Sequence, residues 1–277
     1  MRWLTQYRVK GINSEWVKEE LHSNKYKVIK YTEESKDIFL GVNIRGGIMY
    51  FVKDNTYNGR CDIKNLNTNK ETNRYLAPNN IDVFIQDDIA ENIVIKTNST
   101  NTFDKIVGSC NEFGIESNII TLGNGIRLYR SFGEIDSCGL DEIPKGHQYI
   151  NMYKVIIGRT YGKGLKGERI PKPRIIGPDE IVTGSLLMIG KSEDKRYCEN
   201  IVKYMETKIF SLLVSLRKST HNATKEAYKF VPMQDFSTNS DIDWSLTVPE
   251  IDKQLYKKYN LTQEEIDYIE RTIKPME

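Results

Sequence analysis

The longest regular pattern of apolar and polar positions lies between residues 192 and 218. Apolar side chains recur there every three or four residues, at Cys198, Ile201, Val202, Met205, Ile209, Leu212, Leu213 and Leu216. This spacing places them on one face of an α-helix of about seven turns. Ser192 is a suitable N-cap, and Glu193 and Asp194 follow in the first turn, where the helix dipole favours acids. The pattern therefore predicts one long helix in the core of a domain.

The N-terminal stretch predicts a helix followed by a pair of strands. Ser14 is a suitable N-cap for a helix over residues 14–23, and alternating residues favour a strand over 25–31. The uninterrupted apolar run 48–52 lies between turn formers, which is typical of a buried strand. Because three elements do not bury such a strand pair on both faces, we expect an incomplete sheet with an exposed edge.

Further along the chain, strands and helices are predicted to alternate. The asparagine-rich stretch 65–80 lacks periodicity, which predicts a loop and a domain boundary. Asp87 is expected to cap a short helix, and capping boxes at 247–250 and 262–265 are expected to open the last two helices. Strands are predicted over residues 81–85, 127–132, 153–157 and 181–189. This order favours an α/β segment followed by a mixed α+β domain.

Composition narrows the class of protein. The formal net charge is only +2, so the charge of the whole chain predicts no partner. The four cysteines are scattered without a CxxC pair, which is typical of reduced thiols in a cytoplasm and argues against a zinc site. No apolar run approaches the roughly 18 residues that a membrane span needs. We therefore expect a soluble, cytoplasmic protein without a membrane partner.

The segment 159–174 concentrates positive charge. It holds six cations against one acid, Glu168, and its glycines and prolines keep the backbone irregular. Such a loop suits phosphate contacts in a DNA groove, and its arginines are the expected base readers because their planar fork matches guanine. With the two cations that end the long helix, the predicted DNA-binding residues are Arg159, Lys163, Lys166, Arg169, Lys172, Arg174, Arg217 and Lys218. A solvated surface loop is the alternative interpretation.

A nuclease is the second functional interpretation. Pro178-Asp179 and Glu193-Asp194-Lys195 carry the letters of a PD…ExK metal site. That chemistry requires acids on adjacent strands around a magnesium ion, with the lysine beside them. Glu193 is instead predicted in the first turn of a helix, where an acid has a capping role. A stand-alone, magnesium-dependent restriction endonuclease stays open as the alternative function.

Several segments of the chain resemble sequence motifs of one protein family. They are residues 1–4, 44–47, 57–59, 153–155, 181–190, 200–218, 230–236, 241–244 and 250–276. These segments resemble the C-terminal half of adenine-specific DNA methyltransferases of type II restriction–modification systems, the large kind with fused methyltransferase and restriction activities. The likeness covers nearly the whole chain, and it departs from the family at Gly184-Ser185.

The resemblance implies a division of the chain and a role. Residues 1–60 would be the last part of a Rossmann-like methyltransferase domain, and residues 61–277 a mixed α+β target-recognition domain with one long core helix. The family uses S-adenosylmethionine and an Asn/Asp-Pro-Pro-aromatic loop that holds the flipped adenine. This chain has no Pro-Pro pair and no Gly-rich donor turn. The resemblance therefore implies a role in DNA sequence recognition, without catalytic, cofactor-binding or metal-binding residues in this chain.

Two explanations of the missing motifs stay open. A separate chain carrying the N-terminal catalytic half would make this a natural split enzyme, and a truncated reading frame is the other explanation. In both cases double-stranded DNA is the expected partner, and no reaction is predicted for this chain by itself. The target sequence is not predicted, because recognition side chains are set by the geometry of the fold.

Overall fold

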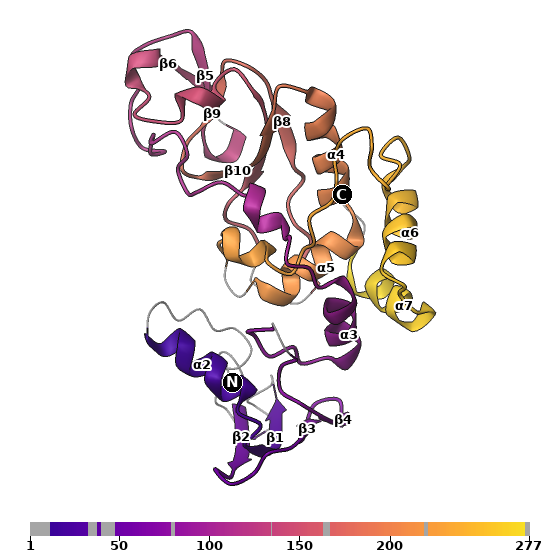
Figure 1. The fold of residues 1–277 in the computed structure, drawn as a ribbon. Coiled ribbons are helices and arrows are strands. Elements are labelled where there is room, and N and C mark those ends of the chain that lie inside the picture. Colours follow the sequence, from indigo (N-terminus) through magenta and orange to yellow (C-terminus); the bar gives the residue numbers. More distant parts are fainter. Residues whose placement is uncertain are drawn as a thin grey trace. The chain divides into compact units, whose positions relative to one another are not determined.

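The computed structural model describes residues 12–32, 38–39, 48–78, 81–133, 135–162, 167–218 and 221–274. The chain has a mixed α/β composition and divides into two compact units, Met1–Ile95 and Lys96–Glu277 (Figure 1). Among the described residues, no helix has both the length and the apolar character needed to cross a membrane.

The N-terminal unit is built on one mixed sheet beside a helix. Helix α2 (Ile12–His22) precedes β1 (Tyr26–Thr32), β2 (Ile48–Lys53), β3 (Cys61–Asn65) and β4 (Glu71–Arg74). The strand order is β2-β1-β3-β4, with β1 antiparallel to β2 and parallel to β3. Helix α3 (Asp88–Thr97) follows, and the Asp87 carboxylate accepts from the Ile89 N–H at 3.0 Å. The predicted first helix, the strand pair and the Asp87 cap are confirmed, but α2 begins at Ile12, so Ser14 lies within the helix and is not its N-cap.

Strand β2 is an edge strand, although its apolar run predicted a buried one. Tyr50, Phe51 and Val52 are 51%, 44% and 53% exposed. The prediction of burial is wrong because β1 pairs on one side of β2, and the described residues place no strand on its other side. The predicted exposed edge is thereby confirmed for the part of the unit that the structure describes.

The predicted boundary near residue 60 cuts through this sheet. Cys61 and Ile63 on β3 are buried, and β3 joins β1 in parallel register, so the N-terminal unit continues to Ile95. The predicted loop 65–80 contains β4, which forms a hairpin with β3 after a turn at Asn65. Residues 81–85 form no strand. They are an irregular segment in which several apolar side chains are buried.

The C-terminal unit contains two three-stranded sheets. The first has the order β10-β7-β8, from β7 (Tyr153–Gly158), β8 (Arg174–Ile176) and β10 (Leu186–Ser192). The second has the order β6-β5-β9, from β5 (Ile126–Tyr129), β6 (Ile135–Cys138) and β9 (Glu180–Val182). The predicted strand 181–189 is therefore two strands in different sheets. The separation occurs at a turn in which the Leu186 N–H donates to the Thr183 carbonyl.

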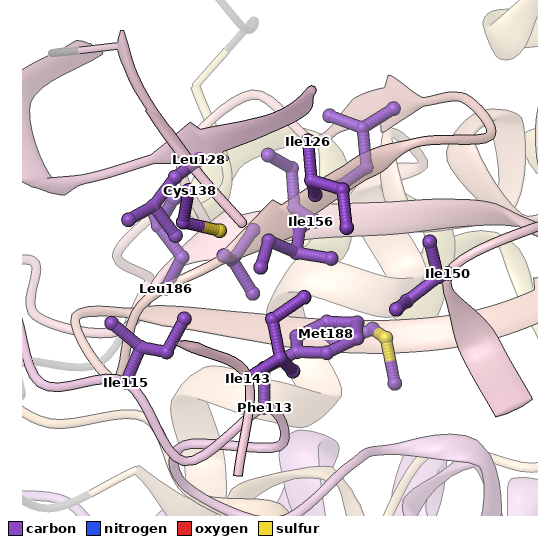
Figure 2. Packing of buried hydrophobic residues seen from close by; sticks show 13 residues of the cluster. Phe113, Ile115, Ile126, Leu128, Cys138, Ile143, Ile150, Ile156, Leu186 and Met188 are labelled. Carbon is purple, nitrogen blue, oxygen red and sulfur yellow. The ribbon is translucent and has the colours of Figure 1, made fainter. Parts of the chain in front are cut away.

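Side chains from both sheets share one hydrophobic core. Ile126, Leu128 and Cys138 of the second sheet lie with Ile156 and Met188 of the first in one buried cluster. Figure 2 shows these side chains converging between the strands. Burying each large aliphatic side chain of this cluster contributes roughly 2 kcal/mol to the stability of the unit, before conformational entropy is subtracted. The shared core fixes the position of the segment that connects β7 to β8.

The predicted long helix is two helices. Helix α4 (Lys195–Met205) is capped by Asp194 rather than Ser192, and α5 (Lys208–Arg217) begins after Thr207. The Asp252 carboxylate accepts from the Lys208 N–H at 2.9 Å and the Ile209 N–H at 3.2 Å. These contacts satisfy free donors at the start of α5, so the break is stabilised by a residue distant in sequence.

The last two helices confirm the capping-box predictions. Helix α6 (Val248–Lys258) has the Thr247 and Glu250 box, and α7 (Gln263–Thr272) has the Thr262 and Glu265 box. Both pack against α5, and α6 also packs against α4. The 3₁₀ helix η6 (Lys225–Tyr228) packs against α5 and against the 3₁₀ helix η2 (Phe103–Ile106). Aromatic side chains of both 3₁₀ helices form one cluster with an aromatic side chain of α5.

Asp252 gives the C-terminal unit a pH dependence. Burial raises the pKa of Asp252 to about 6 from 3.8, although two backbone N–H groups donate to it. The folded state therefore binds a proton that the unfolded state lacks at intermediate pH. As pH rises through this window, from about 4 to about 6, the free energy of unfolding should fall by about 3 kcal/mol.

The variant Asp252→Asn removes this titration while keeping an oxygen that accepts an N–H. Urea unfolding of both proteins at several pH values measures the effect. The difference in unfolding free energy between wild type and variant should change across the window and be constant well above it. A difference that does not depend on pH would contradict the raised pKa.

Candidate nucleic-acid interface

The basic loop, residues 159–174, connects β7 to β8. Its described parts are residues 159–162 and 167–174, which are irregular up to Arg174, the first residue of β8. Lys163 and Lys166 lie outside the described residues. The predicted irregular backbone is confirmed for the parts that the structure describes.

The first limb of the basic loop, residues 159–162, pairs with residues 221–223. The Arg159 carbonyl accepts from the Ala223 N–H at 2.8 Å, and the Tyr161 N–H donates to the His221 carbonyl at 2.9 Å. The Arg159 guanidinium is half-buried and donates to the Gly184 carbonyl at 3.4 Å. This limb is therefore held by backbone contacts on one side.

The second limb, residues 167–173, lies along helix α5. The Gly167 N–H donates to the Ser215 hydroxyl at 3.1 Å. Arg169 donates to the carbonyls of Glu206 at 2.8 Å and Thr207 at 3.2 Å, where α4 ends and α5 begins. Burial lowers the pKa of Arg169, yet the group stays charged at neutral pH because an arginine loses its proton only at very high pH. Arg169 thus binds its own backbone at the junction of the two helices.

Gly167 is required by this close approach. Its φ is +80°, and a Cβ added there would lie 2.8 Å from the Thr272 carbonyl oxygen. A side chain is excluded both by the backbone conformation and by the end of α7. The glycine therefore serves the packing of the second limb.

The two cations at the end of α5 face the protein. Lys218 is 3% exposed, and its Nζ donates to the Tyr161 carbonyl at 2.8 Å and the Glu168 carboxylate at 3.2 Å. The side chain of Arg217 is 9% exposed; its Nε donates to the Glu226 carbonyl at 2.7 Å, and its guanidinium lies 5.1 Å from the Phe230 ring. Both side chains were predicted to contact phosphates, and both are instead engaged in contacts within the C-terminal unit.

Two of the predicted cations are exposed at the end of the second limb. Lys172 and Arg174 are exposed, whereas Ile170 and Pro173 beside them are buried. This alternation directs the cations outward while apolar neighbours fix the backbone. The Arg174 guanidinium lies 5.9 Å from the ring centre of Tyr129 on β5, a distance at which the ring face attracts a cation. Lys172 and Arg174 are the described loop cations best placed to meet a phosphate.

Asp179 and Asp194 of the PD…ExK region have local roles, whereas Glu193 precedes α4 and does not lie in its first turn as predicted. Asp179 lies in the turn between β8 and β9 with a φ of +56°, and its N–H donates to the Ile150 carbonyl. Asp194 caps α4 by accepting from the Arg196 N–H at 2.8 Å. In the described ranges, no three His, Cys, Asp or Glu side chains come together as metal ligands.

Sequence reasoning missed the residues that hold the basic loop. Ser215 and Asn222 contact its two limbs, and Tyr129 lies under Arg174. One signal was present, since Ser215 is a small polar residue within the apolar part of a helix, where it provides a hydroxyl for a neighbouring segment. The contacts of Asn222 and Tyr129 depend on the tertiary fold and leave no local pattern.

The family-like motifs near the C-terminus build the core. Trp244 donates from Nε1 to the Asp235 carbonyl at 2.9 Å, and the Gln234 amide donates to the Tyr259 hydroxyl at 2.7 Å. No protein-family model matches the chain, and no curated protein matches it either.

Proposed function

We propose that the C-terminal unit recognises double-stranded DNA through the basic loop. The observation that carries this proposal is the exposure of Lys172 and Arg174 on a limb whose other contacts attach it to α5. Cations on a fixed backbone bind phosphates with little loss of conformational entropy, because the second limb is already held against α5. Such contacts position a protein on the duplex and bring neighbouring side chains to the bases.

The geometry favours Arg174 over the other loop arginines as a base reader. Arg169 donates to backbone carbonyls at the α4–α5 junction, and Arg159 donates to the Gly184 carbonyl. Arg174 is exposed, and its guanidinium fork matches the two acceptors of guanine in the major groove. Lys172 is better suited to a phosphate because its ammonium is a point charge.

Binding measurements on single variants test this proposal. Lys172→Ala should lower the slope of log affinity against log salt by about one unit at every DNA sequence. Arg174→Ala should cost about 1–3 kcal/mol on the preferred sequence and less on unrelated DNA. Duplexes selected from a random pool provide the preferred sequence, and fluorescence anisotropy at several salt concentrations provides affinity and slope.

Lys257→Ala is the matched control for these variants. Lys257 is an exposed lysine on α6 of the same unit, outside the basic loop. Its removal changes the net charge as much as Lys172→Ala does and should leave the salt slope unchanged. An unchanged salt slope in Lys172→Ala, together with unchanged affinity of Arg174→Ala for the preferred sequence, would contradict DNA contact by Lys172 and Arg174.

On this proposal, the chain acts as the C-terminal part of an adenine-specific DNA methyltransferase of a restriction–modification system in the cytoplasm. The edge strand β2 supports it, because β2 exposes apolar residues and, among the described residues, pairs with a strand on one side only. The missing strands, S-adenosylmethionine and the catalytic loop would come from a separate chain carrying a Rossmann-like catalytic half. Magnesium-dependent cleavage of unmethylated DNA by this chain would favour the nuclease interpretation instead.

A further inference from the structure

The two limbs of the basic loop meet at the C-terminal end of α5. Lys218 Nζ donates to the Tyr161 carbonyl of the first limb and to the Glu168 carboxylate of the second limb. The same Nζ lies 4.1 Å from the ring centre of Tyr161. One buried ammonium thus connects residues on both sides of the loop.

Gly162 shows how closely the limbs approach. A Cβ added at Gly162 would lie 2.3 Å from the Glu168 Oε2, and its φ of +61° is unfavourable for other residues. The carboxylate that accepts from Lys218 therefore covers the backbone of the first limb. We call this arrangement, in which Lys218 bonds to Tyr161 and Glu168 and Glu168 lies against Gly162, the closed stem of the basic loop.

The burial of Lys218 argues against a phosphate contact in this arrangement. At 3% exposure the ammonium cannot reach a DNA backbone without leaving both of its loop partners. Leaving them would also remove the charged donor from the Tyr161 carbonyl and the Glu168 carboxylate in a partly buried place, which is costly. The sequence prediction placed Lys218 among the DNA contacts, and the structure buries it between the two limbs of the loop.

We propose that Lys218 is a positioning residue that closes the stem of the basic loop and so holds Lys172 and Arg174 in the arrangement that binds DNA. This inference rests on the proposed DNA recognition. Glu168 and Lys172 belong to the same limb, and Arg169, Ile170 and Pro173 between or beside them are anchored. An open stem lets this limb leave α5, so the exposed cations lose their fixed spacing.

The expected size of the effect follows from the population of the closed stem. If opening leaves a tenth of the molecules competent, the apparent affinity for DNA falls about tenfold. The number of phosphates contacted by the competent molecules is unchanged, so the salt slope stays at the wild-type value. A lost phosphate contact has the opposite signature, a slope reduced by about one unit.

The test compares two variants. Lys218→Met keeps the aliphatic part of the side chain but removes its charge, and Lys218→Arg keeps the charge and the hydrogen-bond donors. Limited trypsin digestion of the full chain, followed by mass spectrometry, reports loop opening without any DNA. DNA affinity and salt slope are measured on the same proteins with the selected duplex. With a tenth of the Lys218→Met molecules closed, nine-tenths are open, so trypsin should cut this variant after Arg169 at least several-fold faster than wild type. It should bind about tenfold more weakly at unchanged slope, and Lys218→Arg should retain most of both properties.

Each outcome decides between the two proposals. Wild-type protein that binds no duplex contradicts DNA recognition, while digestion still reports on the stem. Wild-type digestion rates in Lys218→Met, or a salt slope reduced by one with unchanged digestion, would overturn the positioning role. If Lys218→Met does not fold, Glu168→Gln replaces it and should move digestion and affinity in the same direction by a smaller factor; no movement overturns the role.

Discussion

Replacing Phe103 by alanine should lower the free energy of unfolding of the C-terminal unit by about 4 kcal/mol. The Phe103 ring is fully buried, with the Phe210 ring centre 4.9 Å away and the Tyr204 ring centre 5.9 Å away, both in edge-on geometry. Tyr228 and Phe236 complete its surroundings. Truncation removes the buried surface and the edge-to-face contacts and leaves a cavity that rigid rings fill poorly.

Tryptophan fluorescence during urea unfolding measures this effect. Trp244 belongs to the same cluster, since its ring centre is 5.4 Å from that of Phe236. Replacing Trp3 and Trp16 by phenylalanine leaves Trp244 as the reporter of the C-terminal unit. Leu122→Ala is the control, because Leu122 is 90% exposed and should change the unfolding free energy little. A loss below about 1 kcal/mol in Phe103→Ala would show that the cluster does not carry the stability of the unit.

Elements with local signals were predicted well. The capping boxes at Thr247 and Thr262 exchange hydrogen bonds within four residues, so the sequence alone contains both partners. The same holds for Asp87 at the start of α3 and for the alternation that predicted β1. Each of these predictions depends on contacts between near neighbours in the chain.

Elements set by distant contacts were predicted badly. The apolar stripe of α4 continues into α5 in register, and Asp252 and Arg169 contact the break from elsewhere in the chain. Thr207 is a suitable N-cap and was the one local sign of a second helix. Strand β4 was missed for a related reason, since its asparagine and threonine side chains are acceptable only because β3 pairs with it.

The basic loop shows why charge alone predicts a site poorly. Lys218 and Lys172 are equivalent in a count of cations, yet the first is buried beneath the loop and the second is exposed. The difference depends on which backbone carbonyls and carboxylates the fold brings within reach of each ammonium. Sequence reasoning therefore identified the segment, and the structure is needed to separate the groups that hold it from those that face outward.

Placing lysines on the edge strand should abolish self-association and partner binding of the N-terminal unit. Tyr50 and Val52 are two residues apart on β2, so they share one face of the strand, and both are about half exposed. They belong to an edge strand that pairs with β1 and with no second strand among the described residues. An unpaired apolar edge invites pairing with another chain, whereas lysine on an edge opposes it. Wild-type protein should sediment as concentration-dependent oligomers, and Tyr50→Lys/Val52→Lys should sediment as a monomer.

Co-expression with a chain carrying a methyltransferase catalytic half extends this test to the partner. The wild-type chain should purify with that half as a stable complex, and the double lysine variant should not, because its edge no longer accepts a strand. Ile120→Lys/Leu122→Lys is the matched control, since these residues are also exposed and apolar but lie in the C-terminal unit. A wild-type chain that stays monomeric at every concentration tested and gains no partner would refute the edge as an assembly surface. Equal loss of complex in the control pair would instead trace the effect to added charge rather than to β2.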